Sequence, residues 1–145
     1  MINSFSGKHE FLSNMYLCII EDRHHIRWRS AEHCYAAYKS KDKTVREKIR
    51  SLPHPKQAKK YAQKIPLRED WHQVKVKLMR GIVRAKFTQN SDLKKLLLKT
   101  DNEELVEGNY WHDNFWGNCL CDKCLHITGS NLLGKILMNV RNEIR

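Results

Sequence analysis

The sequence lacks a long hydrophobic run, a secretory signal and an even set of cysteines. Its longest apolar runs are short, such as residues 96–98, whereas a membrane-spanning helix needs roughly 20 apolar residues. Residues 1–7 do not contain a basic segment followed by an apolar one. The five cysteines, an odd number, give no disulfide framework and fit a reducing compartment. We therefore expect a cytoplasmic protein without a membrane segment.

Motifs that read nucleic-acid sequence are also absent, although the chain is strongly basic. Lysine and arginine number 27 against 16 acidic residues, which gives a net charge of +11. This charge should attract polyanions or phosphorylated small molecules. No helix-turn-helix, zinc-finger or RNP pattern accompanies it, so we do not expect a dedicated sequence reader. The charge is spread along several predicted helices, and solvated faces explain most of it.

The 145 residues suffice for one domain with its own core. We predict a mainly α-helical fold with a small N-terminal β-hairpin, formed by the β-prone runs 17–20 and 25–28. Apolar residues at helical spacing predict a long core helix over residues 70–87 and another helix from Asn131. The stretch 108–129 has no period, and a loop of that length is usually functional or tied by a metal.

Chemically capable side chains gather in the helix that Ser30 can cap, which we expect to run to about Lys41. Helical spacing places Glu32, Tyr35 or its neighbour, and Lys39 on one stripe. Such a stripe is either a solvated surface with an ion pair or the floor of a pocket. As a site, it would suit cleavage of a C–N bond to ribose. A carboxylate can stabilise the oxocarbenium-like state or activate water, and an amine can capture the opened sugar as a Schiff base.

The loop of residues 108–129 holds two further groups. The first consists of the aromatic residues Tyr110, Trp111, Phe115 and Trp116. These side chains form either a small core under the loop or a flat wall for a planar ring, with the carboxylates of Glu107 and Asp113 nearby.

The second group is Cys119-x-Cys121-x2-Cys124, which offers three zinc ligands, with His126 or His112 as a fourth. The spacing differs from a standard Cys-x2-Cys pair, and no second pair exists elsewhere in the chain. We therefore favour reduced cysteines, and we expect no metal and no cofactor.

Several motifs follow one another along the chain: Phe11-Leu-Ser13-Asn14-x-Tyr16; Trp28-x-Ser30-x-Glu32-His33-x-Tyr35-x-Ala37-x-Lys39; Leu67-Arg68-x-Asp70-Trp71-x3-Lys75; Ala85-Lys86-Phe87-x-Gln89-Asn90; Leu105-Val106-Glu107; Asp113-x2-Trp116-Gly117; and Gly129-x-Asn131-x-Leu133-Gly134-x2-Leu137-Met138-x2-Arg141. In this order and spacing, the sequence resembles the NADAR family of YbiA-like N-glycosidases. The resemblance covers residues 1–145 as a single domain. Two departures are Tyr35 and Ala36, where many relatives have Phe and Gln.

The resemblance implies a helical cytosolic enzyme that hydrolyses N-glycosidic bonds. Two substrate classes are associated with the family: phosphorylated ribosylamino-pyrimidine intermediates of riboflavin synthesis, and ADP-ribose attached to guanine in nucleic acid. Carried over, Glu32 is the catalytic carboxylate and Lys39 a second catalytic residue. The substrate-binding candidates are Ser13, Asn14, Tyr35, Arg68, Trp71, Lys86, Glu107, Asp113, Trp116 and Asn131, among which Arg68 suits a phosphate.

We predict removal of ADP-ribose from guanine as the function, because a basic chain suits a nucleic-acid substrate. Hydrolysis of the riboflavin intermediates is the alternative within the same class. From other classes, a non-catalytic module that binds ADP-ribose or nucleotide and a basic nucleic-acid-binding protein held by zinc stay open. The sequence also leaves open a toxin partner and the oligomeric state.

Overall fold

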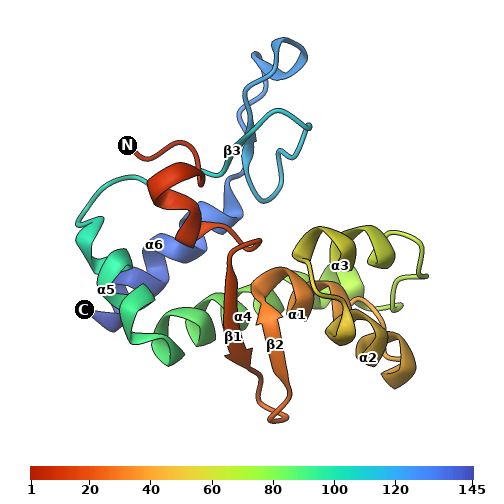
Figure 1. The fold of residues 1–145 in the computed structure, drawn as a ribbon. Helices are drawn as coiled ribbons and strands as arrows, with labels where there is room; N and C mark the ends of the chain where they lie inside the picture. The colour runs from red at the N-terminus through yellow and green to blue at the C-terminus, as the bar shows by residue number, and fades with distance from the viewer. The chain divides into compact units, whose positions relative to one another are not determined.

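The hairpin predicted near the N-terminus is present. In the computed structural model, which describes residues 1–145, β1 (Leu17–Glu21) and β2 (Arg27–Ser30) pair antiparallel, with Ile20 opposite Trp28. Ile20 and Trp28 are buried, whereas Leu17 and Glu21 are exposed. One face of the hairpin therefore belongs to the core. Figure 1 shows the hairpin lying beside helices of the same region.

Asp22, in the turn of the hairpin, fastens β2 to the helix that follows. Its carboxylate accepts hydrogen bonds from the backbone of His24 and Ile26, from Trp28 Nε1 at 2.9 Å, and from the Tyr38 hydroxyl. Burial raises the pKa of this carboxyl, but these hydrogen bonds outweigh burial and hold the pKa below its ordinary value. Because hydrogen bonds to a charged group contribute about 1.5–3 kcal/mol each, Asp22 is a major anchor of the region.

Four helices follow the hairpin: α1 (Ala31–Ala37), α2 (Lys43–Ser51), α3 (Pro55–Ala62) and α4 (Trp71–Gln89). All seven residues of α1 are buried, and α2, α3, α4 and β2 all contact this helix. Helix α4 also packs on β1. A short central helix is thus enclosed by its neighbours.

Helix α1 ends at Ala37, so the predicted end near Lys41 is wrong. Tertiary hydrogen bonds explain the early end. The carbonyl of Lys39 accepts from the backbone N–H of Arg68 at 2.7 Å, and that of Ser40 accepts from Arg46 Nε at 2.7 Å. The carbonyl groups of Lys39 and Ser40 therefore accept from these tertiary donors and not from the N–H groups of a further helical turn.

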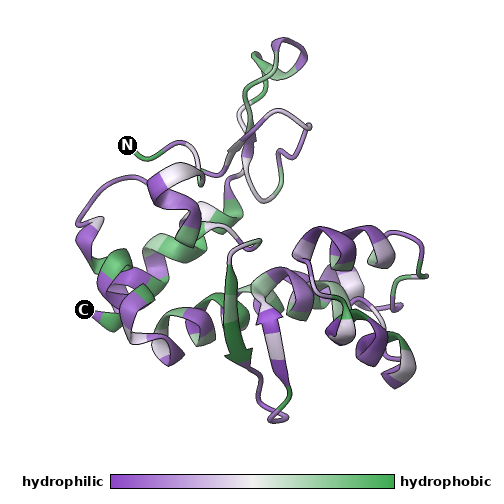
Figure 2. Ribbon diagram, viewed as in Figure 1, coloured by the Kyte–Doolittle hydropathy of each residue, from purple (hydrophilic) through white to green (hydrophobic).

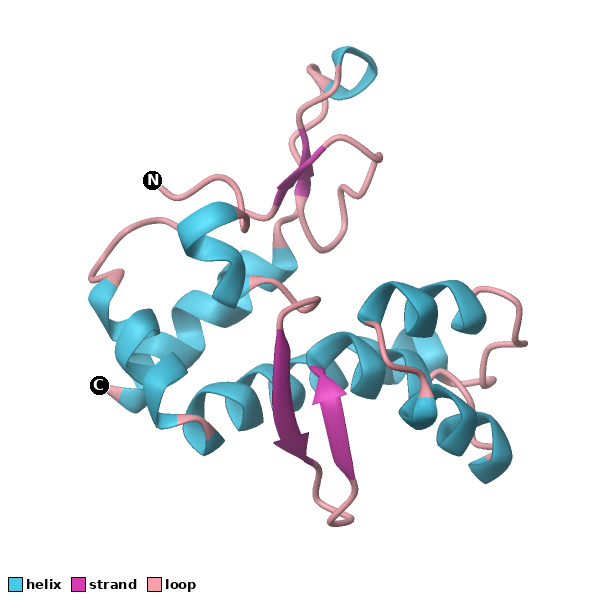
Figure 3. Cartoon of the chain, in the orientation of Figure 1, coloured by secondary structure: helices cyan, strands magenta, loops and turns pink.

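The chain divides into two compact units. The hairpin and α1–α4 belong to the central unit, residues 14–91. The terminal unit comprises residues 1–13 and 92–145 and contains η1 (Gly7–Leu12), nearly all of α5 (Ser91–Lys99), β3 (Gly108–Asn109), β4 (Asn118–Cys119), η2 (Asp122–Cys124) and α6 (Leu132–Ile144). Figure 3 shows the parallel β3–β4 pair and the long loops around it. This strand pair was not predicted from the sequence.

The prediction of a mainly helical fold with a small hairpin is confirmed. Figure 2 shows the expected distribution of hydropathy, with β1 largely hydrophobic and α2 and α3 mostly hydrophilic. None of the helices is both long enough and apolar enough to cross a membrane.

Candidate active site

The first turn of α1 is fixed by side-chain hydrogen bonds. The Ser30 hydroxyl accepts from the His33 backbone N–H at 3.0 Å, which confirms Ser30 as the N-cap, and lies 2.6 Å from His33 Nδ1. His33 Nε2 lies 2.8 Å from the carbonyl oxygen of Leu52, which can only accept, so this nitrogen carries the proton. Burial lowers the pKa of His33. The imidazole is therefore a neutral structural link between α1 and the end of α2.

Glu32 occupies this first turn, and its side chain is largely withdrawn from water. The residue is 8% exposed, and its backbone N–H donates to the carbonyl of Asn14 at 3.0 Å. Burial raises the pKa of the Glu32 carboxyl to about 7, because the attraction of Lys39 and Lys59, which acts in the opposite sense, is weaker than the desolvation. A carboxyl group that exchanges its proton near neutral pH suits general acid–base chemistry.

Lys39 lies in the turn after α1 and extends over an aromatic ring. Its Nζ is 5.3 Å from the centroid of the Tyr35 ring, and this ring lies 5.1 Å from that of Trp71 at an angle of 56°. Burial lowers the pKa of Lys39, Glu32 opposes this shift, and Lys59 and Lys75 reinforce it. The ammonium forms no direct ion pair with Glu32. A lowered pKa increases the fraction of neutral amine, the form that attacks carbonyl carbon.

Lys59 on α3 and Lys75 on α4 were not predicted as site residues. Both are half-buried, and both act electrostatically on Lys39. Lysines on a helix face give the same sequence pattern whether they face solvent or a functional site. Periodicity therefore could not identify Lys59 as a site residue. Lys75 closes a motif shared with the family, which is the one signal that could have singled it out.

The remaining predicted residues of the central unit are largely engaged in structure. Arg68 donates from Nε and Nη2 to both carboxylate oxygens of Asp70, at 2.6 and 3.0 Å. The Nδ2 of Asn14 donates to the Met79 sulfur at 3.4 Å. Lys86 is 1% exposed, with its Nζ 5.7 Å from the centroid of the Tyr16 ring. Their binding of substrate stays a prediction.

In the terminal unit, the backbone around Glu107 is held by an amide side chain. Asn131 Oδ1 accepts from the Glu107 N–H, and its Nδ2 donates to the Leu105 carbonyl, each at 2.9 Å. A side chain on Gly117 could not fit, because its Cβ would lie 2.2 Å from the Glu107 carbonyl oxygen. Asn131 therefore positions Glu107, and Gly117 must remain glycine. The Ser13 backbone N–H donates to the carbonyl of Glu10, at the end of η1.

Asp113 organises the aromatic part of the loop. Its Oδ1 accepts from the backbone N–H groups of Phe115 and Trp116, at 3.0 and 2.9 Å. The rings of these two residues meet edge to face, with centroids 4.9 Å apart. Tyr110 and Trp111 are 68% and 61% exposed, so these two rings do not form a core under the loop.

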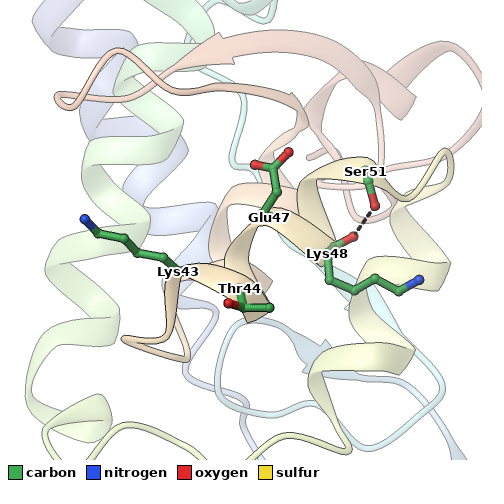
Figure 4. A pocket seen from close by; sticks show the side chains of 5 residues that line it. All are labelled: Lys43, Thr44, Glu47, Lys48 and Ser51. Carbon is green, nitrogen blue, oxygen red and sulfur yellow. Dashed lines mark hydrogen bonds between the residues drawn. The ribbon is translucent and has the colours of Figure 1, made fainter.

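A hollow of about 460 Å³ on α2, shown in Figure 4, is lined by Lys43, Thr44, Glu47, Lys48 and Ser51. In the figure these side chains project from one exposed helix, and none is a predicted site residue. The hollow is therefore a surface feature and not the active site. The candidate catalytic residues of the central unit are Glu32 and Lys39.

The sequence model of the NADAR domain matches residues 3–145. The chain belongs to the NADAR family. An N-glycosidase of Nostoc punctiforme is 42% identical to it over 123 residues, which are 81% of this chain and 75% of that protein. The N-glycosidase YbiA of Escherichia coli is 37% identical over 119 residues, 81% of this chain and 71% of that protein. The NMR structure of the E. coli protein YbiA is similar with a TM-score of 0.82 at 32% identity, covering 99% of this chain and 86% of that one.

A riboflavin biosynthesis protein of Vibrio vulnificus is 38% identical over 139 residues. The match covers 94% of this NADAR chain but 36% of the Vibrio protein, so the chain spans about a third of that relative. The names of the Nostoc and E. coli relatives confirm the prediction of an N-glycosyl hydrolase. The name of the Vibrio relative is consistent with the riboflavin-related alternative.

Glu32→Gln tests whether burial sets the protonation of this group. The folded chain holds the Glu32 proton more tightly than the unfolded chain, where the pKa is near 4.5. The resulting stabilisation is fully present below about pH 4.5 and is lost as the pH rises through about 7. Between about pH 5 and about pH 8 we expect the deprotonation of Glu32 to lower the wild-type free energy of unfolding by roughly 2.5 kcal/mol. Urea unfolding at both pH values measures it, and the same pH dependence in Glu32→Gln would contradict the assignment.

Proposed function

We propose that this NADAR domain hydrolyses the N-glycosidic bond between ADP-ribose and guanine in nucleic acid, with Glu32 and Lys39 as catalytic residues. The observation that carries the proposal is a buried carboxyl and a half-buried amine in one part of the central unit, with the pKa of each shifted toward neutrality. Buried groups with such shifts are concentrated at catalytic sites.

Glu32 would act on the anomeric carbon of the ribose. As this carbon loses its bond to the base nitrogen, positive charge develops across the C1′–O4′ bond. A carboxylate in a poorly hydrated site stabilises that charge, or removes a proton from the water that attacks C1′. The pKa of about 7 leaves a large fraction of Glu32 as carboxylate at neutral pH.

Lys39 offers a covalent route to the same products. The neutral amine attacks C1′, the C1′–N bond breaks, and the departing base takes a proton. The ring then opens as the C1′–O4′ bond breaks and O4′ takes a proton, which leaves an imine between Lys39 and C1′. Water adds to this imine and releases the free sugar and the amine. The lowered pKa of Lys39 supports this route, because only the neutral amine is nucleophilic.

Lys59 and Lys75 would bind the diphosphate of ADP-ribose. They approach Lys39 from two different helices, α3 and α4, and both are half-buried. Partly desolvated ammonium groups bind phosphate oxygens by charge-assisted hydrogen bonds. The net charge of +11 adds long-range attraction for a nucleic-acid substrate.

A second candidate is hydrolysis of a phosphorylated ribosylamino-pyrimidine of riboflavin synthesis. The Vibrio relative, named a riboflavin biosynthesis protein, favours it. The same carboxyl, amine and phosphate-binding lysines would serve, because both substrates join a ribosyl C1′ to nitrogen and carry phosphate. The site chemistry alone supports either substrate, and the basic charge favours nucleic acid.

Product analysis with Glu32→Gln as the inactive variant tests the activity. We expect the wild type to release ADP-ribose from an oligonucleotide carrying ADP-ribosylated guanine, and Glu32→Gln to be slower by about a thousandfold, as loss of a general acid–base group predicts. Glu47→Gln is the control, since Glu47 is an exposed acid that pairs with Arg50 on α2.

Release of ribose 5-phosphate from the pyrimidine substrate alone would establish the second candidate. Saturable binding without product from either substrate would mean a binding module. Wild-type rates in Glu32→Gln would remove Glu32 from the mechanism.

Borohydride trapping tests the covalent route. The reagent reduces an imine to a stable amine, so wild type incubated with substrate should gain the mass of one sugar adduct. We expect Lys39→Ala to gain none. Lys41→Ala should be labelled like wild type, because Lys41 is an exposed lysine paired with Glu69. Absence of the adduct from wild type would leave direct attack by water as the mechanism. An adduct that persists in Lys39→Ala would instead place the imine on another amine and exclude Lys39 as the nucleophile.

Lys59→Gln tests phosphate binding. Loss of one charge-assisted hydrogen bond should raise KM for the ADP-ribosylated oligonucleotide about tenfold. Lys60→Gln is the matched control, because Lys60 is the exposed neighbour on α3. Binding of free ADP-ribose to both variants, measured by calorimetry, separates affinity from any change in the protonation of Glu32. Equal affinities in the two variants would exclude Lys59 as a phosphate ligand.

A further inference from the structure

The loop between β3 and α6 brings four metal-binding side chains together. They are His112, Cys119, Cys121 and Cys124, here called the Cys/His cluster. One ligand atom from each lies within 4.8 Å of the others. His112 Nδ1 is 3.4 Å from the sulfur of Cys121, 3.4 Å from that of Cys124 and 3.9 Å from that of Cys119. His126, the other predicted candidate for a fourth ligand, is not part of this cluster.

Hydrogen bonding does not account for this arrangement. A neutral imidazole Nδ1 carries either one proton or one lone pair, so it forms one directed hydrogen bond and not three. In a tetrahedral zinc site, bonds of about 2.3 Å to sulfur and 2.0–2.1 Å to nitrogen place these ligand atoms about 3.6 Å apart. The three observed distances from His112 Nδ1 to the cysteine sulfurs lie on either side of that value. The four side chains therefore converge on a common centre.

The surroundings of the cluster also resemble those of a structural metal site. Cys119 and Cys124 are buried, and no cysteine of the chain is in a disulfide. Asn114 contacts two of the cysteines, because its Nδ2 donates to the Cys124 sulfur at 3.6 Å and its Oδ1 accepts from the Cys119 backbone N–H at 2.9 Å. Second-shell hydrogen bonds of this kind orient metal ligands. His112 has a φ of 69°, an uncommon conformation for a residue with a side chain, which a ligand bond would help to hold.

We propose that the Cys/His cluster binds one zinc ion, which ties the Asp113–Asn118 segment at both ends. On binding, the ion replaces the protons of three thiols, which pass to water, and takes the lone pair of the neutral His112 Nδ1. The bound cluster then carries a single net negative charge. Four protein ligands leave no open position, so the ion is structural and not catalytic. The sequence alone favours reduced cysteines, because the spacing differs from a standard Cys-x2-Cys pair and no second pair exists, although His112 is one possible fourth ligand.

The zinc ion would replace the hydrophobic core that this loop lacks. Tyr110, Trp111 and Leu125 are all exposed, and the regular structure between β3 and α6 is limited to β4 and η2. Loops without a core of their own are commonly ordered by a metal. His112 and Cys119 flank the turn that Asp113 organises. The proposal does not depend on the enzymatic activity of the chain.

Metal analysis of the full chain, purified under reducing conditions without added zinc or chelator, tests the proposal. We expect about one zinc per chain in wild type and less than about a tenth in Cys121→Ser or His112→Asn. Cys18→Ser is the control, since Cys18 is a half-buried free cysteine of the central unit. Cobalt substituted into wild type should give the d–d bands of a tetrahedral site and a thiolate charge-transfer band.

A second measurement does not depend on how well the variants fold. Chelation of wild type should raise amide hydrogen exchange in residues 110–128 at least tenfold and leave β1 and β2 unchanged. Wild type free of zinc and without the cobalt bands would overturn the proposal. So would a disulfide between two of the three cysteines in freshly purified reduced protein, or unchanged exchange after the metal is removed.

Discussion

The central unit is built around a carboxyl group that is kept from water. Glu32 sits in a helix whose seven residues are all buried, enclosed by α2, α3, α4 and the hairpin. A fully paired carboxylate would have a low pKa and would hold its charge. The attraction of Lys39 and Lys59 lowers the pKa of this carboxyl less than desolvation raises it. This balance keeps the proton of Glu32 exchangeable near neutral pH, which an acid–base catalyst requires.

The rest of the central unit maintains that enclosure. Asp22 gathers hydrogen bonds from the hairpin turn, Trp28 and Tyr38, and so fixes the end of α1 against β2. His33 links the start of the same helix to the end of α2. Both polar groups are satisfied by several partners, unlike Glu32. The contrast separates buried polar residues that specify the fold from the one that is free to change its protonation.

Two β-prone runs predicted the hairpin, and apolar residues at helical spacing predicted both long helices, because these elements bury one regular face. The end of α1 was not predictable, since tertiary donors from Arg46 and Arg68 stop it. Of the candidate site, Glu32 and Lys39 could be singled out, because their spacing within one short motif is a local property of the sequence, although Lys39 lies in the turn after α1. Lys59 could not, because its approach to Lys39 depends on how α3 packs against α1.

The terminal unit reaches order by different means. Around β3 and β4, side-chain amides form many of the backbone hydrogen bonds that helices and sheets form elsewhere. Asn109 binds the backbone of Asp113 and Trp111, and Asn131 binds that of Glu107 and Leu105. Each amide supplies both a donor and an acceptor, so it can replace a strand that is missing from a ladder. Amides fix the backbone but exclude little water, which leaves the loop short of hydrophobic stabilisation. The proposed zinc ion at the Cys/His cluster would add four bonds to this loop and so supply stabilisation that the amides do not.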